Sequence, residues 1–76
     1  MNNPRRKTIR AIIDSLNDLR NTLDDVYDEE ETYRDSIPEN MQGGERYEKA
    51  DEACDNLSDA VDGLDEVISS LEAAME

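Results

Sequence analysis

Apolar residues recur at alternating intervals of three and four along two long stretches of the chain. The first set, interrupted by Glu30, comprises Ile9, Ile12, Leu16, Leu19, Leu23, Val26, Tyr33 and Ile37. The second set comprises Tyr47, Ala50, Cys54, Leu57, Val61, Leu64, Ile68, Leu71 and Met75. This spacing places each set on one side of an α-helix and is typical of helices that pack against other helices. The pattern therefore predicts an all-α protein with two long helices.

The residues that favour turns are concentrated between the two sets. Residues 36–44 read Ser-Ile-Pro-Glu-Asn-Met-Gln-Gly-Gly. Pro38 has no amide hydrogen and disfavours helix at Ile37, and the glycine pair allows the backbone to reverse. We expect a single domain over residues 1–76, in which a helix over about 4–35, a turn over about 36–44 and a helix over about 45–75 follow one another.

Folding the chain back at this turn brings the two apolar sets together. If Tyr33 lies opposite Tyr47, each apolar residue of the first set from Ile9 to Val26 finds an apolar partner without a shift in register, and Glu30 lies opposite Ala50. The predicted contact between the helices, the seam, consists of Ile9, Ile12, Leu16, Leu19, Leu23, Val26, Leu57, Val61, Leu64, Ile68 and Leu71. This pairing favours an antiparallel, coiled-coil-like hairpin of two helices.

A two-helix hairpin of 76 residues encloses little core, and this chain has no Phe, no Trp, no His and one Cys. An internal disulfide and a zinc cluster are excluded, so we expect oligomerisation to supply the missing burial. Small residues beside the second set widen its apolar side to about three positions in seven, as in bundles; they are Ala53, Ala60, Val67 and Ala74. The expectation is a dimer forming a four-helix bundle, or a larger partner that completes the fold.

Charge divides the chain into a short basic start and a long acidic body. The formal net charge is −13, with 21 acidic and 8 basic residues. Half of the basic residues precede every acidic one; they are Arg5, Arg6, Lys7 and Arg10. The hairpin places this start near Glu72 and Glu76. Because binding to nucleic acid requires a basic surface, direct binding of DNA or RNA is not expected.

No apolar run has the length of a membrane span, and the amphipathic start does not resemble a signal peptide. A free Cys54 on an inward position suits a reducing compartment, so we expect a location in the cytoplasm. No membrane partner is expected.

The sequence offers no arrangement of residues that suits catalysis. Histidine is absent, and Cys54 lies at an apolar position where a small core residue is expected. The acid-rich stretches lack the glycine and the ligand spacing of a calcium-binding loop, and Gly43-Gly44 lacks the Lys and Ser/Thr of a phosphate-binding loop. We expect a protein that is not an enzyme and that needs no cofactor or metal.

Two groups of residues are candidates for binding a partner protein. Carboxylates recur every three or four residues on the outer side of the second helix, and this acidic face comprises Glu48, Glu52, Asp55, Asp59, Asp62 and Glu66. Side chains near the turn are candidate anchors, because aromatic and large apolar residues dominate interfaces; these are Tyr27, Tyr33, Ile37, Met41 and Tyr47. Like charges at this spacing destabilise a helix, so two interpretations of the acidic face stay open: a solubilising surface and a surface that binds a partner.

The turn and the start of the second helix also resemble a known group of proteins. Ile37-Pro38-Glu39-Asn40, then Gln42, Gly43 and Arg46-Tyr47-Glu48, followed by an acidic heptad helix, are similar to small uncharacterised proteins of phages and prophages of Gram-positive bacteria. This resemblance covers about the last 40 residues. It implies a helical hairpin in a bacterial or phage setting, and it implies no activity.

These observations support two hypotheses about function. The first is a noncatalytic, self-associating helical hairpin that binds other proteins. The second is a mimic of nucleic acid that blocks the basic groove of a DNA- or RNA-handling defence enzyme. A net charge of −13 on helices of roughly 48 Å amounts to one charge per about 3.7 Å, or per about 1.8 Å in a dimer, against about 1.7 Å in duplex DNA.

Overall fold

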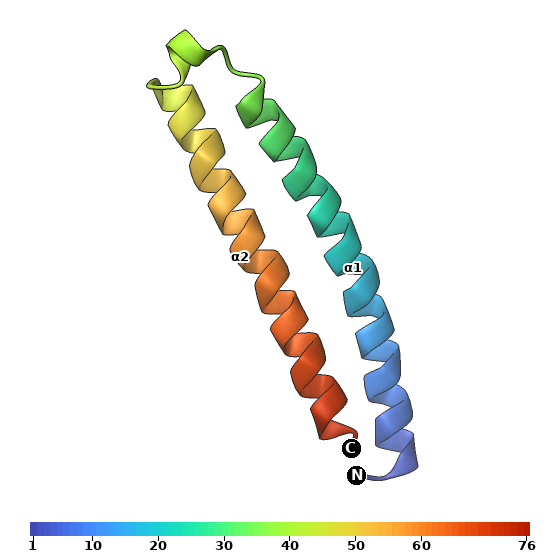
Figure 1. Cartoon of the computed structure of the whole chain (residues 1–76). Coiled ribbons are helices and arrows are strands. Elements are labelled where there is room, and N and C mark those ends of the chain that lie inside the picture. The colour runs from blue at the N-terminus through green and yellow to red at the C-terminus, as the bar shows by residue number, and fades with distance from the viewer.

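The computed structural model describes the whole chain, Met1–Glu76, and shows two long helices that pack against each other. Helix α1 spans Asn3–Asp35, a short 3-10 helix η1 spans Glu39–Met41, and helix α2 spans Glu45–Ala74. Figure 1 shows that α1 and α2 run in opposite directions, with both chain termini at the end away from η1. The predicted all-α hairpin is confirmed. It measures 59 × 15 × 13 Å.

Local interactions account for the start of α1 and for the turn. Asn2 caps α1, because its side-chain oxygen accepts a hydrogen bond of 2.9 Å from the amide of Arg5. Beyond α1, the amide of Met41 donates to the carbonyl of Pro38 at 2.8 Å, which closes η1. The turn contains no residue with a positive φ. The chain therefore reverses through η1 and does not use the left-handed conformations that glycine makes accessible.

Helix α2 presents the second apolar set to α1. Ala50, Cys54, Val61 and Ile68 are buried, with exposed fractions of 2–7%. The remaining members of the second apolar set are partly buried and continue the same stripe; they are Tyr47, Leu57, Leu64, Leu71 and Met75. A 3-4 apolar spacing keeps one stripe facing the neighbouring helix when the two helices coil slightly around each other, because on a straight helix the stripe drifts by about 20° per heptad.

Helix α1 is rotated relative to the prediction. Ile13 is 7% exposed, whereas the adjacent Ile12 is 45% exposed, Leu19 is 62% exposed and Val26 is 43% exposed. The prediction that Ile12, Leu19 and Val26 line the seam is therefore wrong for the contact between α1 and α2. Ile9, Leu16 and Leu23 are partly buried and remain on the inner side of α1. The other positions on the inner side of α1, each three or four residues from one of these, are Ile13, Arg20, Tyr27 and Arg34.

Two ion pairs between the helices accompany this rotation. The guanidinium of Arg20 bonds the carboxylate of Asp65 at 3.0 Å and 3.3 Å, and that of Arg34 bonds Asp51 at 2.9 Å. Arg20 and Arg34 extend their aliphatic stems along the edge of the seam, and their side chains are 29% and 20% exposed. Rotating α1 so that Leu19 points inward would turn Arg20 away from α2 and separate it from Asp65.

Candidate interaction surfaces

The rotation of α1 leaves a row of large apolar side chains on the outside of the hairpin. This exposed apolar column consists of Ile12, Leu19, Val26 and Tyr33, which are 42–62% exposed. Its members are seven residues apart, so they follow one another along the same side of α1 at intervals of about 10.5 Å. Isolated exposed apolar residues are normal on a protein surface, but a continuous row is typical of an interaction site.

A contact near the turn shows which side of α2 adjoins this column. The Nε of Arg46 donates a hydrogen bond of 2.8 Å to the hydroxyl of Tyr33, and its guanidinium carbon lies 5.3 Å from the centre of the Tyr33 ring. Because the helices are antiparallel, moving seven residues back along α1 and seven forward along α2 keeps the two positions level. The residues of α2 beside the exposed apolar column are therefore Ala53, Ala60, Val67 and Ala74, which we call the small-residue column.

These two columns lie on a side of the hairpin that carries few charges. The neighbouring positions are uncharged over most of their length; they are Thr8, Ser15 and Thr22 on α1 and Asn56, Gly63 and Ser70 on α2. Glu29, Arg46 and Lys49 are charged, and all three lie toward the turn. We call the two columns with these six uncharged neighbours the uncharged face. It forms a two-helix-wide surface with large side chains on α1 and small ones on α2.

The acidic face lies farther around α2 and adjoins the uncharged face, because Glu52, Asp59 and Glu66 are three or four residues from Asn56, Gly63 and Ser70. Every member of the predicted carboxylate column is exposed. None of these carboxylates takes part in an ion pair; the acidic partners in ion pairs are Asp24, Asp35, Glu45, Asp51 and Asp65. The structure thus separates an apolar side from a side that carries unpaired negative charge.

The residues predicted as anchors at the turn do not form one exposed group. Tyr33 and Met41 are 42% and 49% exposed, and Tyr27 and Tyr47 are partly buried. Ile37 is 3% exposed, so its prediction as an exposed anchor is wrong. It continues the seven-residue series of Leu16, Leu23 and Glu30, which directs it inward where the chain leaves α1. An open cleft of about 400 Å³ lies beside it, between η1 and the start of α2.

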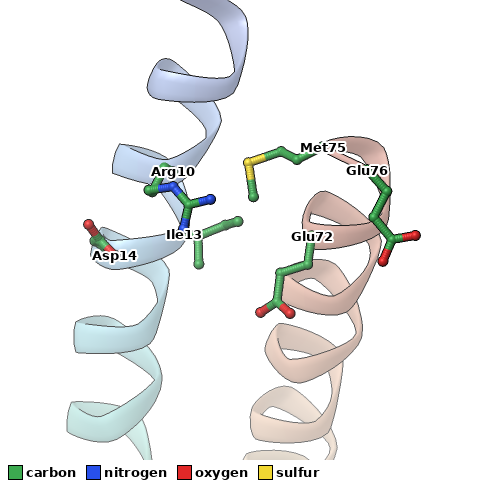
Figure 2. A pocket seen from close by; sticks show the side chains of 6 residues that line it. All are labelled: Arg10, Ile13, Asp14, Glu72, Met75 and Glu76. Carbon is green, nitrogen blue, oxygen red and sulfur yellow. The ribbon is translucent and has the colours of Figure 1, made fainter. Parts of the chain in front are cut away.

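A second open cleft, of about 480 Å³, lies between the chain ends. Figure 2 shows Ile13 and Met75 pointing toward one another across it, with the charged side chains of Arg10 and Glu72 beside them. The basic start of the chain does lie near the end of α2, as predicted. The contact between them, however, is not with the carboxylate of Glu72 or Glu76. It is a hydrogen bond of 3.0 Å from the Nε of Arg6 to the backbone carbonyl of Met75.

Two titratable groups between the helices, the Cys54 thiol and the Tyr27 hydroxyl, are held in their neutral forms. Burial raises the pKa of the Cys54 thiol, which is 2% exposed. A hydrogen bond to Glu31 raises the pKa of the Tyr27 hydroxyl. A buried neutral thiol is a poor nucleophile, so these groups fit a packing role. No group of three or more carboxylates or thiols is arranged to hold a metal ion.

Sequence reasoning did not place Ile13, Arg20, Tyr27 and Arg34 in the contact between the helices, because it selected the most apolar spacing on α1. The missed signal was the fourteen-residue interval between Arg20 and Arg34, matched on α2 by the fourteen-residue interval between Asp51 and Asp65.

Comparisons with protein-family models, with curated proteins and with solved structures gave no match to this chain. Neither helix has the length and apolar character that crossing a lipid bilayer would require.

Proposed function

We propose that this protein is a noncatalytic, self-associating helical hairpin that binds other proteins, derived from a phage or prophage and acting in the bacterial cytoplasm. The observation that carries the proposal is the exposed apolar column beside a small-residue column, on an otherwise strongly charged molecule. A single chain gains nothing from exposing Leu19 at 62%. A partner that covers it would gain hydrophobic burial of about 25 cal/mol per Å².

The limited core of the hairpin supports association. Only six of its 76 residues are buried. Its Cα radius of gyration is 17.3 Å, whereas about 11.4 Å is expected for a compact domain of this length. An elongated pair of helices has one neighbour per helix, and a dimer would form a four-helix bundle in which each helix has two.

Sedimentation equilibrium over about 1–500 µM tests self-association directly. The expected result is a mass that rises from that of the 8.6 kDa chain to twice this value. Far-UV circular dichroism at each concentration reports whether the helices persist on dilution. A mass that stays at one chain up to the highest concentration would contradict self-association.

A second candidate function is mimicry of nucleic acid, and the unpaired carboxylates of the acidic face favour it. Over the 59 Å length, the net charge of −13 amounts to one charge per about 4.5 Å, or per about 2.3 Å in a side-by-side dimer, against about 1.7 Å in duplex DNA. The charge density is therefore lower than the estimate made from helix length alone.

The two functions depend on different surfaces, so one set of variants separates them. Replacing Asp55, Asp59 and Asp62 by Lys should abolish inhibition of a DNA-handling enzyme while leaving the mass of the free protein unchanged. Binding by a mimic should also weaken steeply between low and physiological salt. Inhibition that is insensitive to salt and to these substitutions would exclude mimicry.

A further inference from the structure

We infer that the uncharged face is the surface through which two copies of this chain associate. This inference rests on the proposed self-association and assigns it to one side of the hairpin. The exposed apolar column of each copy provides Ile12, Leu19 and Val26, and the small-residue column beside it leaves room for large side chains from the other copy. The partner is a second copy of the same hairpin.

Charge restricts which faces of two identical chains can meet. At a net charge of −13, bringing two acidic faces together would place unpaired carboxylates opposite one another. In a two-fold dimer the same surface of both copies lies in the interface, so this surface must tolerate itself. Over residues 8–26 of α1 and 53–74 of α2, the uncharged face contains no acidic residue. It is therefore the side on which two copies can meet without burying like charges.

The two threonines on this face are suited to burial. The hydroxyl of Thr8 donates to the carbonyl of Pro4, and that of Thr22 donates to the carbonyl of Asp18, both at 3.1 Å. Because these hydroxyls are already hydrogen-bonded within α1, a second copy can cover them without leaving an unpaired polar group.

The exposed area also fits what a stable dimer needs. The hairpin exposes 5484 Å², whereas a compact protein of 8.6 kDa exposes about 4,700 Å². The difference of about 800 Å² equals the area that each partner contributes to a typical specific interface. Covering one long face with a second hairpin would bring the accessible area of each chain into the ordinary range.

Single glutamate substitutions on opposite faces test this assignment. Leu19→Glu and Ala60→Glu place a carboxylate on the uncharged face, and each appears twice in a symmetric interface. The controls Asn21→Glu and Ser69→Glu add the same charge at exposed positions on the opposite side of α1 and α2. We expect the first pair to raise the dimer dissociation constant about a thousandfold, and the controls to change it by less than about tenfold. Dissociation constants for Leu19→Glu and Ala60→Glu that match those of the controls would overturn the inference.

Thiol protection gives a measurement that does not depend on disruptive variants. In a Cys54→Ser background, a cysteine introduced as Ala60→Cys should react with maleimide more slowly as protein concentration rises, whereas one introduced as Ser69→Cys should react at a constant rate. A dimer that leaves the thiol of the Ala60→Cys variant fully reactive would refute this face while leaving self-association intact. A wild-type chain that stays monomeric would refute both.

Discussion

The adjacent residues Ile12 and Ile13 provide a direct test of how α1 is rotated. They are chemically identical neighbours on one helix, yet Ile13 is 7% exposed and Ile12 is 45% exposed. Replacing each by Ala removes the same atoms, and the helix propensity gained, about 0.4 kcal/mol, is also the same. Any difference between the two variants therefore reports on burial.

The structure sets the expected magnitudes. Truncating a buried Ile to Ala costs about 2–5 kcal/mol, and the lower end suits a seam that only two helices enclose, so Ile13→Ala should cost about 2–3 kcal/mol. Ile12 is roughly half exposed, and its truncation should cost less than about 1 kcal/mol in the isolated hairpin. A domain of this length has about 4–11 kcal/mol of stability in total, so the loss at Ile13 is a large fraction of it.

Urea unfolding followed by circular dichroism, at a concentration where sedimentation shows a single chain, gives both values. Equal losses, or a larger loss for Ile12→Ala, would refute the rotation of α1 and restore the predicted seam. Repeating the measurement at high concentration adds a second contrast. The loss for Ile12→Ala should grow when a second copy covers that side chain, and the loss for Ile13→Ala should not.

Three further predictions follow from single features of the structure. A Cβ at Gly63 would meet no atom within 4 Å, so Gly63→Ala should raise the unfolding free energy of the single chain by about 1 kcal/mol in urea titrations; a loss would show that α2 cannot accept the methyl group. Burial raises the pKa of Cys54, so the contribution of this thiol to stability should be constant below the unfolded pKa of about 8.5 and fall as pH rises above it. Cys54→Ala should reduce the loss of stability above that pH, and an unchanged pH profile would argue against a buried thiol. The net charge of −13 opposes compaction, so raising NaCl from about 20 to about 500 mM should raise the melting temperature by a few degrees; a lower melting temperature would show that the ion pairs dominate.

The sequence by itself determined the elements and the turn. The 3-4 spacing on α2 contains a single apolar stripe, so its buried residues Cys54, Val61 and Ile68 could be predicted from the pattern alone. Pro38 and the polar residues around it stop one helix before the next begins, because proline lacks the amide that a helix needs. Such effects act between residues close in the chain and are visible in sequence.

The rotation of α1 was decided only by the tertiary structure. Two sets of positions on α1 satisfy the 3-4 spacing. Both contain Ile9, Leu16 and Leu23, and they differ in whether Leu19 or Arg20 lies between Leu16 and Leu23. Apolar spacing favours Leu19, but the carboxylates that pair with Arg20 and Arg34 lie 17 to 45 residues away in the chain. Only the folded hairpin brings these charges together, and in doing so it leaves Leu19 on the outside.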